Sequence, residues 1–281
     1  MSPNMLRSRR RAVDFTAKGV SIAFAALSLV ILAWILFVLL ERGLPALGAN
    51  VFLRSMGAPG SGGGLLNAIV GTLIQLTIAL VIGMPVGLLA GTFLAENGKS
   101  SRIGSATRFV NDVLLSAPSI LIGLFVYQMV VLPSGGYSGL AGAVALAIII
   151  VPVVVRTSED MLNLVPIGLR EAAFALGAPQ WKVVTLISWR AARSGIATGV
   201  LLALARAAGE TAPLIFTSFG NSGWSVDLTE PMASLPVAIY QYAGSPAQDW
   251  VSLAWVGALL ITMGVLALNI LTRVLLSPTR H

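Results

Sequence analysis

The sequence contains no cysteine and only one histidine, the terminal His281, among its 281 residues. The lack of cysteine excludes a disulfide framework and a thiolate metal site, and a lone histidine cannot supply a paired-histidine metal site or a Ser/His/Asp triad. Charged residues are also scarce, at 10% against about 25% in a typical soluble domain. These absences exclude disordered chains, coiled coils and most soluble enzymes. We therefore expect no metal site and no catalytic residue in this chain.

Hydrophobic residues make up 56% of the chain, and the mean hydropathy is +0.88. They are concentrated in six stretches that are long enough, or nearly so, to cross a bilayer as a helix, which takes about 20 apolar residues. Helices are expected rather than barrel strands, because lipid offers no partner to unpaired backbone groups and the stretches lack alternation. The sequence therefore predicts an all-α polytopic membrane protein with six transmembrane helices. The predicted spans are residues 20–40, 65–95, 113–132, 137–155, 196–219 and 251–272.

Positive charges are distributed unevenly between the loops that alternate along the chain. Of the 18 Lys and Arg residues, all but three lie at the N-terminus, in the second and fourth loops or after the last span, whereas Arg42 and Arg54 lie on the other side. Because cytoplasmic loops are enriched in Lys and Arg, both termini are predicted to be cytoplasmic. The basic N-terminus is thus interpreted as an orientation signal and not as a nucleic-acid patch. The predicted domains are a cytoplasmic tail 1–19, one transmembrane domain 20–276 with a cytoplasmic loop 156–195, and a cytoplasmic tail 277–281.

Two segments resemble known signals without matching them fully. A cleaved signal peptide is the alternative for the first span, with a faint cleavage pattern at residues 46–48, but the apolar stretch 20–40 is long for a signal core. An uncleaved helix is therefore predicted. The segment 98–100 resembles the end of a nucleotide-binding loop, but Phe93 occupies the position of the first glycine. We therefore expect no nucleotide binding by this chain.

Glycines occur in two patterns that carry different predictions. The segment 57–64 is glycine-rich and is predicted to be a flexible external loop. Within the second span, Gly83, Gly87 and Gly91 recur every four residues, so they share a helix face and let another backbone approach closely. The stripe fits a packed translocation core, but ordinary close packing in any membrane bundle explains it equally well.

Polar side chains occur within two of the predicted spans. In the second span, the polar residues either line a transport path or bond a neighbouring helix; they are Asn67, Thr72, Gln75 and Thr77. In the fifth span, Arg206 and Glu210 are four residues apart and lie near one helix face. A charge at mid-membrane costs roughly 2.5–3.5 kcal/mol on insertion scales, so both side chains should face the protein interior, an aqueous cavity or each other. The alternatives are an anion path, in which Glu210 holds or gates Arg206, and a buried structural ion pair.

The fourth loop contains an unusual polar pattern. The residues that define the pattern are Glu171, Ala172, Ala173, Gly177 and Ile187. The alanine-rich segment predicts a short helix that stops at Gly177, and a second helix is expected from near Pro179. Such a helix–turn–helix either inserts into a groove of a soluble partner or lies on lipid. The pattern resembles the signature of permease subunits of bacterial ATP-binding-cassette importers, although Trp189 and Arg190 stand where Leu and Pro are usual.

The C-terminal third is similar to one type of these permeases, the phosphate-importer type called PstA. The segments that carry this similarity are residues 204–214, 234–240, 247–250 and 268–274. Together with six spans and a matching topology, the resemblance covers nearly the whole chain. It implies the type I ABC-importer permease fold.

The resemblance implies a non-enzymatic subunit that moves inorganic phosphate across the bacterial cytoplasmic (inner) membrane. The implied partners are a second, similar permease subunit, two ATP-binding-cassette ATPase subunits and an extracytoplasmic phosphate-binding protein. ATP and Mg would bind to the ATPases, and this chain would hold no cofactor. The substrate path would include Arg206, Glu210 and Thr211. The residues implied in coupling to the ATPases are Glu171, Ala172, Ala173, Gly177 and Ile187.

Three alternatives remain open. The first is a permease for another oxyanion, such as phosphonate, sulfate or molybdate. The second is an ion-coupled secondary transporter, in which Arg206 and Glu210 form a charge relay. The third is a membrane scaffold or sensor, in which segment 171–187 docks a signalling partner without transport.

Overall fold

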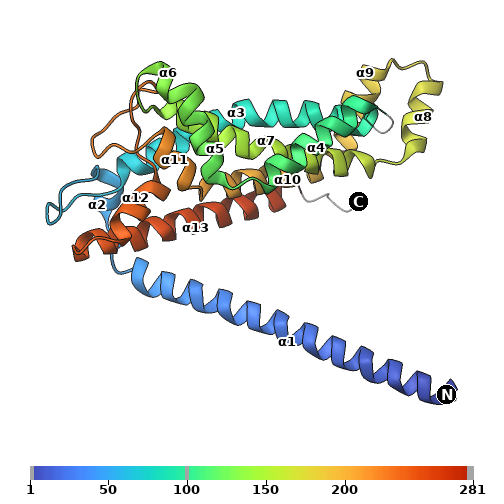
Figure 1. Ribbon diagram of the computed structural model, residues 1–281, viewed down its shortest axis with the longest axis horizontal. Helices are drawn as coiled ribbons and strands as arrows, with labels where there is room; N and C mark the ends of the chain where they lie inside the picture. Colours follow the sequence, from blue (N-terminus) through green and yellow to red (C-terminus); the bar gives the residue numbers. More distant parts are fainter. Residues whose placement is uncertain (1–2, 99–100, 277–281) are drawn as a thin grey trace.

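The computed structural model describes residues 3–98 and 101–276, and every regular element in these residues is a helix. This confirms the predicted all-α class (Figure 1). The helices, with η marking π-helical turns, are α1 Pro3–Gly43, α2 Ala49–Leu53, α3 Leu66–Glu96, α4 Arg102–Ser116, α5 Ser119–Val126, η1 Tyr127–Val131, α6 Leu132–Ser134, α7 Gly139–Asn163, α8 Ile167–Ala175, α9 Gln180–Lys182, η2 Val183–Ser188, α10 Trp189–Ala208, α11 Ala212–Thr217, α12 Leu235–Ala243 and α13 Gln248–Leu276.

Helix α1 leaves the bundle and runs apart from the other helices (Figure 1). Its residues 13–43 are highly apolar but only 6% buried, and Gly43 at its end lies against Leu259 of α13. Helix α1 is continuous from Pro3 through the first predicted span, and the assignment of residues 1–19 to a cytoplasmic tail stays a prediction. The predicted tail 277–281 lies outside the described residues.

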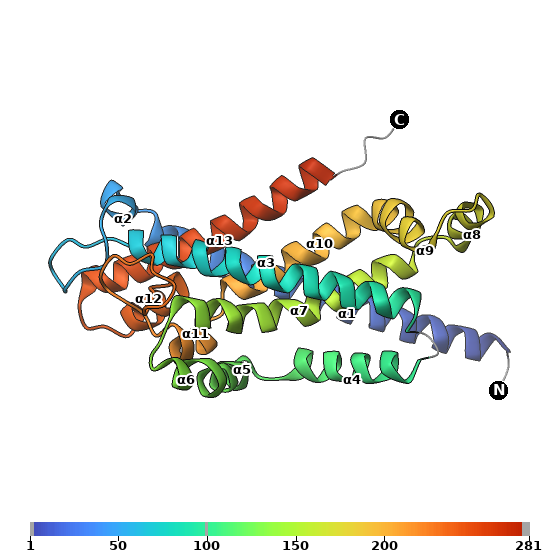
Figure 2. The ribbon, with the colours of Figure 1, turned by 90° about the horizontal axis from the view of Figure 1, so that it is seen from above.

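The core of the bundle is α7, whose apolar stretch is 72% buried. Figure 2 shows α3, α7 and α4 running side by side. The glycine stripe of α3 faces α7: Cβ atoms built at Gly83, Gly87 and Gly91 would meet atoms of α7 at 3.0, 2.7 and 2.7 Å. Only glycine allows the two backbones to approach so closely. The stripe therefore packs two helices of one chain together.

The predicted span 113–132 is not one straight helix. Helices α4 and α5 meet at an angle of 104°. The bend follows from Pro118, which lacks an N–H and disfavours helical geometry at Ala117, where ψ is 133°. A hydropathy pattern does not detect this break, because the residues on both sides are apolar.

Four helices in the described residues are long and apolar enough to cross a membrane, and the bent segment that contains α4 and α5 adds a fifth if it crosses as one span. The four are α1, α3, α7 and α13. The predicted span 196–219 is divided between α10 and α11, with a break at residues 209–211. Glu210 lies within this break, and Arg206 lies in the last turn of α10.

Three polar residues of α3 hold the segment between α11 and α12. Asn67 Nδ2 donates to the carbonyl oxygen of Asn221 at 2.9 Å, Gln75 Nε2 donates to Ser218 Oγ at 3.1 Å, and Thr72 Oγ1 accepts the Leu235 N–H at 2.8 Å. All three side chains are buried. The contacts of these three residues fit bonding to a neighbouring segment. Thr77 is exposed and donates to the Leu73 carbonyl of its own helix.

The glycine-rich loop 57–64 is anchored, contrary to the predicted flexible loop. The Gly60 N–H donates to Asp249 Oδ2 at 2.6 Å, and Trp250 Nε1 donates to the Gly57 carbonyl at 3.1 Å. The Trp250 ring stacks on Tyr242 with centroids 4.4 Å apart. Burial and the nearby Asp249 carboxylate raise the pKa of Tyr242 to about 12, so its hydroxyl stays protonated at neutral pH.

Replacing Gly87 with alanine should destabilise the bundle. Its Cβ would lie 2.7 Å from Cβ of Val154, a stiff β-branched side chain of α7. Such overpacking typically costs about 1–3 kcal/mol. The measurement is thermal unfolding of the purified protein in detergent. Gly264→Ala in α13 is the matched control, because no atom lies within 4 Å of the position that its new Cβ would take. Equal melting temperatures for the two variants would contradict the tight α3–α7 contact.

Candidate functional site

Arg206, Glu210 and Thr211 are brought together at the break between α10 and α11. Helix α10 ends at Ala208, and Thr211 is the N-cap residue of α11. The break follows from Pro213 in the first turn of α11, which lacks an N–H and would clash with the carbonyl of residue 209 if α10 continued. The sequence thereby places a cation, an acid and a hydroxyl within six residues at a helix interruption.

Arg206 and Glu210 are close without forming a tight pair. Arg206 Nε lies 3.9 Å from Glu210 Oε1, which is longer than a hydrogen bond. The Arg206 side chain is 45% exposed, whereas that of Glu210 is 16% exposed. This geometry differs from a buried structural ion pair, because much of the guanidinium remains open on the surface of the chain.

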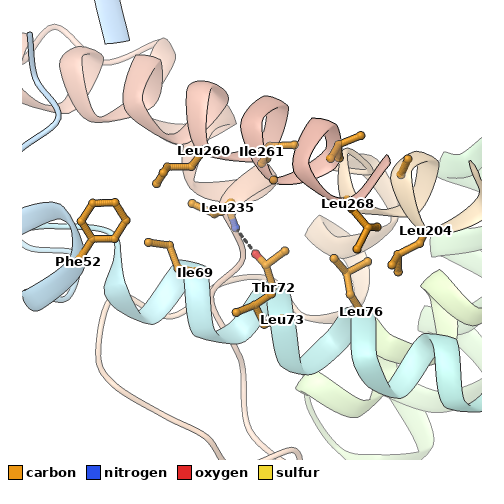
Figure 3. Close-up of a pocket in the computed structure, with 14 residues that line it drawn as sticks. Phe52, Ile69, Thr72, Leu73, Leu76, Leu204, Leu235, Leu260, Ile261 and Leu268 are labelled. Atoms are coloured by element: carbon orange, nitrogen blue, oxygen red, sulfur yellow. Dashed lines mark hydrogen bonds between the residues drawn. The ribbon is translucent and has the colours of Figure 1, made fainter. Parts of the chain in front are cut away.

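An apolar cavity of about 290 Å³ lies beside the other face of α10, between α3, α12 and α13 (Figure 3). Leu204, Leu260 and Leu268 are among its lining residues. Among these residues Thr72 alone carries a hydroxyl, and that hydroxyl already accepts the Leu235 N–H. The lining carries no charge, so this cavity does not suit an oxyanion. In the described part of the chain no three acidic, histidine or cysteine side chains are grouped to hold a metal ion.

The second candidate region is the α8–η2 loop, residues 164–188, at one end of the bundle. Helix α8 ends in a turn in which the Gly177 N–H donates to the Phe174 carbonyl at 2.9 Å and the Ala178 N–H to the Ala173 carbonyl at 3.1 Å. Gly177 has φ +78°, a left-handed conformation that favours glycine. The second helical segment begins after Pro179, the N-cap of α9. The structure therefore shows the helix–glycine–helix arrangement predicted from the sequence.

The α8–η2 loop presents apolar side chains to its surroundings. Phe174 is 49%, Leu176 89% and Trp181 64% exposed. Glu171 and Ala172 are exposed on α8, Ala173 is buried, and Ile187 is partly buried within η2. An exposed apolar surface on a polar loop is typical of a site that binds another protein.

Sequence reasoning missed the contacts that attach this loop to the bundle. Arg170 Nη1 lies 3.0 Å from Glu96 Oε1 at the end of α3, and Arg170 Nη2 donates to the Leu162 carbonyl of α7 at 2.7 Å. The Trp189 indole N–H donates to Thr92 Oγ1 of α3 at 3.1 Å. The available signals were the position of Arg170, directly before Glu171, and the presence of Trp189 in place of the usual Leu.

A second arginine binds the same end of α3. Arg108 of α4 forms an ion pair with Glu159 of α7 at 2.8 Å and donates to the carbonyls of Leu94 and Gly98, both at 3.1 Å. These carbonyls are left without helical partners where α3 ends, so the guanidinium acts as a C-terminal cap. The middle of α4 is thereby joined to the ends of α3 and α7.

Comparison with known proteins assigns the chain to a family. A family model described as binding-protein-dependent transport system inner membrane component matches residues 83–280. This chain belongs to that family. Two relatives, each named phosphate transport system permease protein PstA, come from Pasteurella multocida and Haemophilus influenzae and are 58% and 55% identical to this permease. The alignments cover 86% and 91% of this chain, and 87% and 90% of the relatives.

The fold of this permease also matches a solved importer. The crystal structure of a bacterial alginate ABC transporter, in complex with its alginate-bound periplasmic protein, contains a chain that superposes with a TM-score of 0.64 at 13% identity. The match covers 92% of this chain and 93% of the other. It confirms the predicted type I importer permease fold. Because that transporter carries alginate, the fold alone does not specify a substrate.

Gly177→Ala should loosen the α8–η2 loop. An L-residue in the left-handed conformation costs roughly 1–2 kcal/mol, and no neighbouring atom lies within 4 Å of the new Cβ, so the effect would be purely conformational. Hydrogen exchange of the amides of residues 164–188 should accelerate. Gly168→Ala in α8 is equally free of neighbouring atoms but lies in a helix, so its exchange should stay equal or slow. The same exchange rates in both variants would contradict this role of Gly177.

Proposed function

We propose that this permease is the membrane-spanning subunit of an ATP-driven importer that moves inorganic phosphate inward across the bacterial cytoplasmic membrane. The names of the relatives at 58% and 55% identity support the substrate. The structural observation that carries the proposal is Arg206, which is 45% exposed at a helix break and 3.9 Å from Glu210. ATP and Mg would be bound by partner ATPase subunits, and this chain would hold no cofactor.

The exposure of Arg206 supports a path along the surface of this chain. A cationic side chain facing lipid at mid-membrane costs roughly 2.5–3.5 kcal/mol, so its open face must be covered by protein or water. A second, similar permease subunit would cover it and enclose an aqueous path between the two chains. Glu210 would restrain the guanidinium, and the Thr211 hydroxyl would donate to a phosphate oxygen. The anion would be held weakly, because a site that binds too tightly cannot release it.

The α8–η2 loop would couple the path to ATP hydrolysis. Two ATPase subunits would dock below the two permeases, and the exposed Phe174, Leu176 and Trp181 would enter a groove on one of them. The residues proposed to form this coupling segment are Glu171, Ala172, Ala173, Gly177 and Ile187. Closure of the ATPases on ATP would move the loop and change which side of the membrane the path faces.

The placement of the helix ends supports an orientation with both termini in the cytoplasm. Helix α1 begins and α13 ends toward the side where α8 and α9 lie, whereas α2, α6 and α12 lie at the opposite end (Figure 1). The basic residues of the N-terminus and of the α8–η2 loop would then face the cytoplasm. A phosphate-binding protein would dock at the α2, α6 and α12 end.

Arg206→Ala should reduce phosphate uptake by roughly tenfold or more, because a charge-assisted hydrogen bond contributes about 1.5–3 kcal/mol. The measurement is uptake of radiolabelled phosphate in cells without their own high-affinity system. These cells would express this permease with its partner subunits. Arg206→Lys should retain part of the activity, because it keeps the charge and loses the planar donor geometry.

The matched control is Arg156→Ala. Arg156 is also about half exposed, and it pairs with an acid four residues later, Asp160, at 3.3 Å. Uptake should stay near the unsubstituted level in this variant. Equal uptake in Arg206→Ala and the parent, at equal amounts of assembled complex, would remove Arg206 from the path. If the parent takes up sulfate or phosphonate in place of phosphate, the assignment as an importer holds and the substrate assignment is wrong.

The orientation is tested by reporter fusions. A reporter that is active only in the cytoplasm should give a signal when fused after Arg280. The same reporter inserted near Gly62, in the loop that Asp249 anchors, should give none. An enzyme that is active only outside the cytoplasm should show the reverse pattern. Reversed signals from both reporters would overturn the proposed topology.

A further inference from the structure

Two side-chain links hold the α8–η2 loop to one face of α3. Thr92 and Glu96 are four residues apart near the end of α3 and share a helix face. Glu96 Oε1 lies 3.0 Å from Arg170 Nη1 in α8, and Thr92 Oγ1 accepts the Trp189 indole N–H at 3.1 Å. Arg170 lies near the start of the loop, and Trp189 directly follows its end. The loop is therefore tied to α3 from both sides.

The space between the two links is open. A cavity of about 590 Å³ lies between α3 and the loop, and its lining includes Thr92, Glu96, Gln180, Trp181 and Trp189. The seam between α3 and α7, in contrast, is closely packed through glycines. Where packing is open, a displacement passes between two elements mainly through the discrete polar contacts that bridge them.

The ion pair is suited to transmitting a displacement. The Arg170 and Glu96 side chains are only 15% and 12% exposed, so salt screens their attraction less than that of a surface pair. The second nitrogen of the guanidinium, Nη2, donates to the Leu162 carbonyl at 2.7 Å. One side chain thus connects α8 with the ends of both α3 and α7.

We propose that the Arg170–Glu96 and Trp189–Thr92 links are positioning contacts through which movement of the α8–η2 loop displaces the end of α3. This rests on the proposed function, in which an ATPase subunit moves the loop. Helix α3 then passes the displacement to α7 through the glycine stripe. Trp189 stands where the family signature usually has Leu, so one of the two residues that depart from the signature makes one of the two links.

The Arg108–Glu159 pair supplies a matched control. It lies at the same end of α3, its N–O distance is 2.8 Å, and the Glu159 side chain is 9% exposed. It joins α4 to α7 and is not a link to the loop. If all these contacts are purely structural, Glu96→Gln and Glu159→Gln should change the coupling of ATP hydrolysis to transport to a similar extent. A transmitting role predicts that only the links to the loop affect coupling.

The test uses the complete transporter in proteoliposomes, with a fluorescent label on Asn97→Cys at the C-cap of α3. This chain has no native cysteine, and cysteine-free partner subunits keep the label at one position. Adding ATP should change the label fluorescence in the parent. In Thr92→Val combined with Glu96→Gln, that change and the phosphate moved per ATP should fall about fivefold or more, a typical size for coupling between sites. ATP hydrolysis by the assembled complex should stay within about twofold, because neither residue contacts nucleotide.

Glu159→Gln should leave the ATP-dependent change in fluorescence intact. Trp189→Phe, which keeps the ring and loses only the N–H, should show a partial loss even if the double variant assembles poorly. Unchanged responses in both link variants, an equal loss in Glu159→Gln, or no response to ATP in the parent would each overturn the inference. A parent whose label responds through the links, but which takes up no phosphate, would support the inference and reject the phosphate assignment alone.

Discussion

The close approach of α3 and α7 is the constraint on which the rest of the structure depends. Three glycines on one face of α3 let its backbone lie against α7, the most buried of the long helices. The two helices therefore end side by side, and their last carbonyls are presented together. Arg108 and Arg170 bind these carbonyls and the acids beside them, so the attachment of α4 and α8 follows from the packing of α3 on α7.

Two prolines mark the points where apolar segments are interrupted, whereas Pro85 and Pro152 lie inside α3 and α7 without ending them. Pro118 turns the chain between α4 and α5, and Pro213 separates α11 from α10. The two interrupted segments pack on each other, because a Cβ at Gly123 of α5 would lie 2.6 Å from the Cα of Pro213. After each break the chain continues as a short helix, α5 or α11, which depends for its stability on packing against neighbouring helices. The short helix α11, which follows the break beside Arg206, thus packs against α5, which itself follows a break.

Much of the architecture follows from local sequence. Long apolar runs predict helices, the four-residue spacing of Gly83, Gly87 and Gly91 predicts a close-packed face, and Gly177 predicts the end of α8. Contacts between distant residues were not predictable in this way. The bend at Pro118 lies within an apolar run, and the exposure of Arg206 depends on how α10 packs. Arg170 and Glu96 form an ion pair only because the end of α3 lies beside the first half of α8. The roles of Arg206 and of the α8–η2 loop in transport stay predictions.

The anchored loop between α2 and α3 has a consequence for biosynthesis. The bond from Gly60 to Asp249 joins residues that are 189 positions apart, and Asp249 belongs to the last helix. A ribosome completes that helix only after every earlier segment has been translated. The loop therefore lacks its hydrogen bond to Asp249 while the segments in between are inserted. The hydrogen bond joins the loop before α3 to the first turn of α13, so it forms only after the start of α13 has been translated.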